Sequence, residues 1–426
     1  MVASTSATER RQPARPLPGA VWQAHVVDAG AITAELGRLW RRFGAGDGPA
    51  GESGGRSGED GALVASCAET RASTLNLTAV AQSRAGGKRI EGAVTHLSDL
   101  YPSRATILIA DTERADDQEG GLDVYVTLLE RPAEKGQPAI RFECVTVEVG
   151  AAKERYLASI ASPLLVADLP DFLWWAGSAV RDSGLFTDLL GVSDRVILDS
   201  AGFAGVGELR HLAALLARNQ GLPKMSDFAW ARLTPWRQIV TQFFDPPSAR
   251  PALDALDGVS IRYGGVGDDG RSGFSGALLF AGWLGARLGW RAPGELLPVR
   301  DEPGSWRLTA RTGRLGRERE VSLILQRSSS PLAERSLDEV VLLADGGRGG
   351  EFRVERIDAL GLATASEGPG MPAVQRMVFA GLLDDAALLA EELRMFGRDP
   401  VFEEALLFAA ALAPEGGADT AGAQSA

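Results

Sequence analysis

Residues 172–199, FLWWAGSAVRDSGLFTDLLGVSDRVILD, form the segment that most directly indicates the fold. An apolar run over 172–176 is followed by a helical pattern over 185–190 and by a second apolar run over 195–199. A strand, a helix and a strand within so short a span favour two parallel neighbours in one sheet. The sequence therefore predicts an α/β unit at this point.

The residues before this unit predict a first mixed α/β domain. A helix is expected after Asp28, and strand-like patterns cover 74–81, 105–110, 123–129 and 140–149. In the last of these, apolar side chains switch from even to odd positions. One extra residue at a β-bulge would produce this switch, so we expect a bulge there.

The residues after the unit predict helices around a strand-rich portion. Thr234, as N-cap, and Pro235, at the first helical position, indicate the start of the clearest amphipathic helix in the chain. Strand-like segments beyond Pro303 suggest an antiparallel meander over 306–311, 320–326, 340–344 and 352–357. Asp399 and Pro400 can start the second of two C-terminal helices.

These patterns together predict an α/β protein of two mixed α/β domains, the second with a strand-rich antiparallel portion and C-terminal helices. We expect a flexible N-terminal tail at 1–20, an N-terminal domain at 21–165 with a Gly-rich loop at 44–61, a C-terminal domain at 166–413 and a flexible tail at 414–426.

Composition excludes several classes of function. The 426 residues carry a net charge of −12, which argues against a nucleic-acid partner, because phosphate binding needs a concentrated basic field. No stretch approaches the roughly 18 apolar residues of a membrane span. Two Cys and three His leave little material for a metal site or a disulfide framework. We expect a cytoplasmic protein with no metal, no cofactor and no membrane contact.

Two places are candidates for ligand chemistry. Asp199 and Ser200 lie at the carboxyl end of an expected parallel strand, where open α/β sheets gather ligand-binding groups. The favoured alternative is that Asp199 caps the following turn and Ser200 supports it. The turn Gly265–Gly270 matches the glycine spacing of a dinucleotide site, but Asp268 and Asp269 within it would repel a pyrophosphate. A plain turn is the favoured interpretation.

The two cysteines, Cys67 and Cys144, both fall in strand-like segments. An unreactive buried thiol is the usual outcome in such a position. A redox switch between them is the alternative, and it requires the two sulfurs to approach within bonding distance.

Several segments together are similar to the glucose-6-phosphate dehydrogenase assembly protein family, OpcA. They are RASTLNL (71–77), YPSR (101–104), DLPDFLWW (168–175), RVILDS (195–200) and SDFAWARLTPWRQIVTQFFDP (226–246). The resemblance covers most of the span from 22 to 412. Family members commonly have His where this chain has Tyr101, so no role of that ring nitrogen carries over.

The resemblance implies a non-catalytic subunit that binds glucose-6-phosphate dehydrogenase and promotes its active oligomer, which supports the oxidative pentose phosphate pathway and NADPH supply. Such a protein acts by binding the competent form of its partner more tightly than the incompetent form. The alternative is an enzyme or sensor that binds a sugar phosphate or a nucleotide through Asp199, Ser200 and the Gly265–Gly270 turn.

An activator is expected to use aromatic and Arg side chains at its interface, because these dominate interface energetics. The predicted partner-binding residues are Trp230, Arg232, Trp236, Arg237, Arg71, Asn76 and Arg104. Each has a structural alternative, which we favour for any single residue: the tryptophans can be core residues, and the arginines can hold strand ends by hydrogen bonds.

Overall fold

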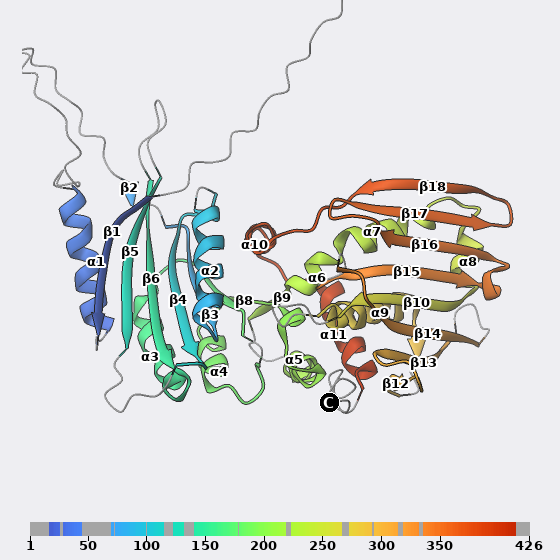
Figure 1. Ribbon diagram of the computed structural model, residues 1–426, viewed down its shortest axis with the longest axis horizontal. Coiled ribbons are helices and arrows are strands. Elements are labelled where there is room, and N and C mark those ends of the chain that lie inside the picture. The colour runs from blue at the N-terminus through green and yellow to red at the C-terminus, as the bar shows by residue number, and fades with distance from the viewer. Residues whose placement is uncertain are drawn as a thin grey trace, which may run out of the picture.

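The computed structural model describes residues 17–414, apart from 26–28, 45–69, 72, 99, 115–121, 132–139, 178, 219–222, 266–271, 292–293, 314–317 and 332–334. Within these residues the chain forms two nine-stranded sheets, which lie side by side with helices around and between them (Figure 1). The predicted α/β fold class is confirmed. The expected Gly-rich loop and most of both expected tails lie outside the described residues.

The first sheet has the strand order β1-β5-β6-β4-β3-β7-β8-β9, and β2 pairs with β6 outside this path. Its strands are β1 (Leu17–His25), β2 (Thr70–Arg71), β3 (Leu75–Ala81), β4 (Ser103–Asp111), β5 (Asp123–Arg131), β6 (Ile140–Gly150), β7 (Asp171–Trp175), β8 (Arg195–Leu198) and β9 (Lys224–Asp227). The run from β6 to β9 is parallel, as the strand–helix–strand segment predicted. The sheet continues through the boundary expected between 165 and 166, so the division into two domains stays a prediction.

Helices cover both faces of this sheet, which explains why its central strands read as continuous apolar runs. On one face α2 (Arg84–Leu97) shares a core with α10 (Asp385–Leu393). On the other face lie α1 (Ala29–Gly44), α3 (Leu157–Ala161) and α4 (Gly184–Leu190). That second core continues into the other sheet, so both sheets share one apolar interior.

The predicted β-bulge in β6 is wrong, because this strand pairs in unbroken register with both neighbours. Phe142 faces one core and Val145 faces the other. Glu143 and Glu148 of the same strand are also buried, one on each face of the sheet. Arg104 neutralises Glu143, and Arg84 neutralises Glu148. The switch in the apolar pattern therefore comes from two buried glutamates in a strand covered on both faces.

The second sheet has the order β11-β13-β14-β10-β15-β16-β17-β18, and β12 pairs with β13. Its strands are β10 (Leu256–Gly264), β11 (Trp290–Arg291), β12 (Leu297–Pro298), β13 (Ser305–Thr312), β14 (Arg319–Ser328), β15 (Leu337–Ala344), β16 (Gly350–Arg356), β17 (Gly361–Gly368) and β18 (Met371–Phe379). The expected meander is interrupted, since β10 inserts between β14 and β15 and runs parallel to β14. Local patterns do not reveal this, because β10 comes from earlier in the chain.

The remaining helices pack mostly between the sheets or on one face of the second. They are α5 (Val206–Arg218), α6 (Phe228–Arg232), α7 (Thr234–Phe243), α8 (Arg250–Asp254), α9 (Phe274–Leu288) and α11 (Pro400–Leu412). At Gly282 of α9 a Cβ atom would lie 2.3 Å from the carbonyl oxygen of Ala405, so glycine permits the close approach of α11.

Two predicted helix starts have different outcomes. Asp399 caps α11 as expected, since its Oδ1 accepts the N–H groups of Val401 and Phe402 at 3.0 Å. The predicted cap at Thr234 is wrong. Leu233 is the N-cap of α7 and has helical dihedral angles, because α6 runs almost directly into α7.

Candidate partner-binding surface

Asp199 and Ser200 follow β8, and both side chains are buried. Arg232 of α6 donates from Nη1 and Nη2 to the two Asp199 carboxylate oxygens at 2.8 and 3.0 Å. The Ser200 N–H donates to Oδ1 of Asp227 at 3.0 Å. The Asp199 carboxylate is therefore held by Arg232, and Ser200 is held through its backbone N–H. The predicted ligand role of both residues stays a prediction.

Asp227 is the second buried carboxylate at this point and caps α6 by accepting the Ala229 N–H at 2.8 Å. Burial raises its pKa from 3.8 to about 6, against the hydrogen bonds from Ser200 and Ala229 that lower it. Asp199, Ser200, Asp227 and Arg232 are named here the junction network. It ties the sheets together, because Ser275 of α9 donates to the Ser200 carbonyl at 2.8 Å.

Three further predicted residues belong to the interior beside this network. Trp230 and Trp236 are 3% and 0% exposed, as the favoured core alternative expects, and their partner-binding role stays a prediction. The Arg237 guanidinium carbon lies 3.4 Å from the ring centroid of Trp230, and burial lowers the pKa of Arg237 to about 10. Trp230 donates from Nε1 to Asp399 at 2.9 Å, so this stack ties α6 and α7 to the start of α11.

The predicted residues of the first sheet also hold structure. Asn76 exchanges hydrogen bonds with both backbone groups of Val166 at 2.9 and 3.0 Å. Arg104 pairs with the buried Glu143 at 2.5 Å. Arg71 lies in β2, and its side chain is outside the described residues. The partner-binding role of these residues stays a prediction, and burial means that Asn76 would act through the shape of the fold.

The remaining sequence candidates lie largely outside the described residues. A strand and a helix flank the Gly265–Gly270 turn as expected, but residues 266–271 lie outside the described residues. Cys144 is fully buried, and burial raises the pKa of its thiol to about 12, whereas Cys67 is outside the described residues. Among the described residues no group of three His, Cys, Asp or Glu side chains could hold a metal, and no helix is long and apolar enough to span a membrane.

The second sheet has one face without a helix among the described residues. Along β13, Trp306, Leu308 and Ala310 point into the core, whereas Arg307 and Thr309 are exposed on the opposite side. Helices α7 and α9 contact the sheet through its buried side. The outward side chains of β10 and β13–β18 belong to neither hydrophobic core. This side is named the open face.

Charged side chains on the open face are largely paired with one another. Arg353 of β16 pairs with Glu351 at 2.8 Å and also with Glu339 of β15. Arg262 of β10 pairs with Glu339 at 3.1 Å, so one glutamate joins three strands. These pairs cancel charge across the middle of the face, which reduces the cost of covering it with a partner.

Exposed apolar side chains cluster at the edge of the open face that β18 forms. Phe379 and Met377 of this edge strand are 81% and 73% exposed, and Leu360, Leu382 and Leu383 are also exposed. Two backbone hydrogen bonds from the segment after β18 to the β16–β17 turn hold them together, Ala380 to Leu360 at 2.8 Å and Leu382 to Ala359 at 3.0 Å. These five exposed side chains are named the apolar ridge. Contiguous exposed apolar surface of this kind marks interaction sites.

A shallow hollow of about 380 Å³ lies beside the ridge on the open face, because Ala363 and Ala365 of β17 are small. Arg353 and Met377 form two of its walls. Neither the hollow nor the ridge was predicted from the sequence. The alternation of side chains along β18 could have predicted the ridge. Met377 and Phe379 lie on the same side of the strand as Gln375, where polar residues are expected.

Comparison with known families covers most of the folded part of the chain. Residues 94–214 match the "Glucose-6-phosphate dehydrogenase subunit N-terminal domain", and residues 223–406 match the corresponding "C-terminal domain". The two matches follow one another in chain order. The chain belongs to the glucose-6-phosphate dehydrogenase assembly protein family, OpcA. The resemblance seen in the sequence is confirmed.

Relatives of this family occur in cyanobacteria under the description "Putative OxPP cycle protein OpcA". The Synechocystis protein is 26% identical over 264 residues, which are 60% of this chain and 52% of the relative. The Nostoc punctiforme protein is 28% identical over 282 residues, 62% of this chain and 56% of the relative. The chain therefore spans about half the length of these curated relatives.

Solved structures share only an outline with this OpcA family member. The 3-ketoreductase KijD10 from Actinomadura kijaniata, solved with NADP, matches with a TM-score of 0.44 and 13% identity, over 79% of this chain and 95% of that chain. The Kluyveromyces lactis transcriptional regulator Gal80p matches with a TM-score of 0.44 and 10% identity, over 82% and 88%. Similarity at this level gives no information on function.

Proposed function

We propose that this chain is a non-catalytic, cytoplasmic subunit that binds glucose-6-phosphate dehydrogenase and promotes its active assembly in the oxidative pentose phosphate pathway. The observation that carries the proposal is the ordered match of both dehydrogenase-subunit domain families across residues 94–406. The predicted catalytic alternative loses support, because Arg232 already binds both carboxylate oxygens of Asp199 and the Ser200 side chain is buried.

The open face with its apolar ridge is the proposed docking surface. Aromatic and methionine side chains are enriched at the centres of interfaces, and Phe379 with Met377 provides both types in an exposed position. The paired charges of Arg353 and Arg262 supply a polar surround that needs no new partner for neutralisation. Since β18 is an edge strand, its free backbone edge can also pair with a partner strand.

Activation requires differential binding. A subunit that binds the competent oligomer of the dehydrogenase about tenfold more tightly than the incompetent form shifts that equilibrium by about 1.4 kcal/mol. Equal affinity for both forms would give co-migration without activation.

The test is a titration of the purified full chain into the dehydrogenase, with activity and oligomer mass followed in the same samples. We expect both to rise together and to saturate at one stoichiometry. Activity that is identical with and without the chain, or a chain that turns over substrate alone, would contradict the proposal.

A matched pair of variants separates docking from general surface effects. Phe379→Ser removes the most exposed side chain of the ridge, whereas Leu100→Ser removes an exposed leucine on the first sheet's side of the molecule. Only the first variant is expected to weaken co-migration and activation.

A further inference from the structure

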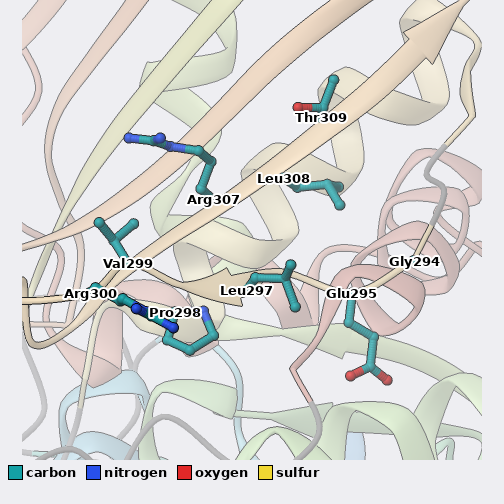
Figure 2. Close-up of a pocket in the computed structure, with 9 residues that line it drawn as sticks. All are labelled: Gly294, Glu295, Leu297, Pro298, Val299, Arg300, Arg307, Leu308 and Thr309. Atoms are coloured by element: carbon teal, nitrogen blue, oxygen red, sulfur yellow. The ribbon is translucent and has the colours of Figure 1, made fainter.

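A second concave region lies at the opposite edge of the second sheet from the apolar ridge. β12 pairs there with β13, and a pocket of about 610 Å³ opens between β13 and the segment 294–300 (Figure 2). Leu297, Pro298, Val299 and Leu308 supply its apolar walls. In Figure 2 the guanidinium groups of Arg300 and Arg307 lie toward the same side of the pocket, while Glu295 lies at the other.

The charges around this pocket are unbalanced. Arg300 and Arg307 are both exposed, and the guanidinium group of neither forms an ion pair or hydrogen bond with a described residue. Glu295, the acidic residue of the lining, is already paired with Arg210 of α5 at 2.5 Å. The pocket therefore presents two guanidinium groups that no described side chain neutralises, beside apolar walls.

The arginines elsewhere on the same sheet face make the contrast clear. Arg262 and Arg353 are neutralised by glutamates, whereas Arg307, on the same side of the sheet, has no ion pair within the part of the chain that the structure describes. Guanidinium forks bind phosphate oxygens in a bidentate manner, and two forks on one side of a pocket suit a dianion better than a single carboxylate.

We infer that this pocket binds a small phosphorylated metabolite, with Arg300 and Arg307 on the phosphate and the apolar walls against the rest of the ligand. The volume of the pocket lies within the range typical of small-molecule sites. A long polyanion is disfavoured by the net charge of −12, which leaves a compact anion as the fitting occupant. The inference goes beyond the proposed function, since it concerns the chain without its partner.

The experiment is isothermal titration calorimetry on the full chain alone, at low ionic strength, with glucose 6-phosphate, inorganic phosphate and glucose as probes. We expect the two phosphates to bind and to compete, and glucose to give no heat. Arg300→Gln and Arg307→Gln should each weaken phosphate binding by about tenfold or more. Arg307→Lys keeps the positive charge but loses the two-pronged guanidinium group, so its phosphate affinity should lie between those of the parent and of Arg307→Gln.

Arg311→Gln is the matched control. Arg311 lies on the same strand and the same exposed side as Arg307 but does not line the pocket. Its variant should bind within about twofold of the parent. Because these side chains are exposed, the thermal transitions of all variants should coincide with that of the parent.

Three outcomes would overturn the inference: no phosphate binding up to about 10 mM, equal binding of glucose, or affinity unchanged in both glutamine variants. Binding of hexaglutamate with the same arginine dependence, but not of phosphates, would instead assign the pocket to an acidic segment of a partner. This experiment contains no dehydrogenase. A negative result would therefore contradict the phosphate site without affecting the proposed activation of the dehydrogenase, which the separate titration tests.

Discussion

The junction network and the open face use the same side-chain chemistry in opposite surroundings. In the junction network Arg232 and Asp199 are 8% and 2% exposed, and their charges are satisfied within the protein. On the open face Arg353 is 41% exposed, although it too pairs with glutamates. The segments that carry the family resemblance supply the first region, and they do not include the second. The motifs at 195–200 and 226–246 therefore contain residues that hold the sheets together, while the proposed docking surface lies elsewhere.

The largest expected effect separates the two regions by stability. Arg232→Ala leaves Asp199 buried without its partner and should lower the free energy of unfolding by about 3–5 kcal/mol. Arg353→Ala should cost less than about 1 kcal/mol, because Arg353 is 41% exposed and its buried partner Glu339 keeps the ion pair with Arg262. Urea unfolding of both variants measures the difference. Equal costs would remove the distinction between a structural and a surface charge network.

The next expected effect is on binding, where a substitution on the open face should matter although it leaves stability unchanged. Phe379→Ser should weaken association with the dehydrogenase by about 10- to 100-fold, since exposed aromatic side chains act as interface hot spots. Its urea midpoint should stay at the parent value, because Phe379 contributes to neither core. Sedimentation or mass photometry over a concentration series gives the affinity. Full affinity in this variant would move the docking surface away from the ridge.

The third effect is a pH dependence that arises from Asp227 of the junction network. Asp227 has a pKa of about 6 in the folded state against 3.8 in the unfolded chain, so the folded protein releases this proton at a higher pH. Its contribution to stability is therefore complete below pH 3.8 and is lost as pH rises to about 6. The loss amounts to at most about 3 kcal/mol.

The Asp227→Asn variant measures this contribution, because it retains an oxygen that accepts the N–H groups of Ser200 and Ala229. We expect its unfolding free energy, relative to the parent, to increase between pH 4 and pH 7. A difference that is constant over this range would show that Asp227 does not titrate there.

The smallest expected effect concerns Cys144. Burial and a pKa of about 12 should leave this thiol unlabelled by iodoacetamide in the native protein at pH 8 and labelled in denaturant. Peptide mass spectrometry after a timed pulse gives both values. Rapid native labelling would show that the first sheet opens locally around β6.

Sequence reasoning located what depends on local chemistry. The parallel unit around β7 and β8 followed from its short strand–helix–strand spacing, and the Asp399 cap of α11 followed from one residue pair. It failed where distant segments meet. The insertion of β10 depends on its pairing with β14, which comes later in the chain. The two buried glutamates of β6 depend on Arg84 and Arg104, which no local pattern identifies as their partners.

The candidate site shows the same limit. Trp230 and Trp236 have the residue type of an interface anchor, but the helices around them enclose both. Phe379 and Met377 have the same chemistry in an edge strand and remain exposed. Residue type alone does not distinguish these cases, because exposure depends on which face of the second sheet the helices cover.

Hydrogen–deuterium exchange of the full chain with and without saturating dehydrogenase tests the central claim most directly. The account predicts new protection over residues 350–379, which form β16 to β18, together with a rise in dehydrogenase activity in the same samples. Activation with protection confined to the junction network, or no protection at all at saturating partner, would contradict it.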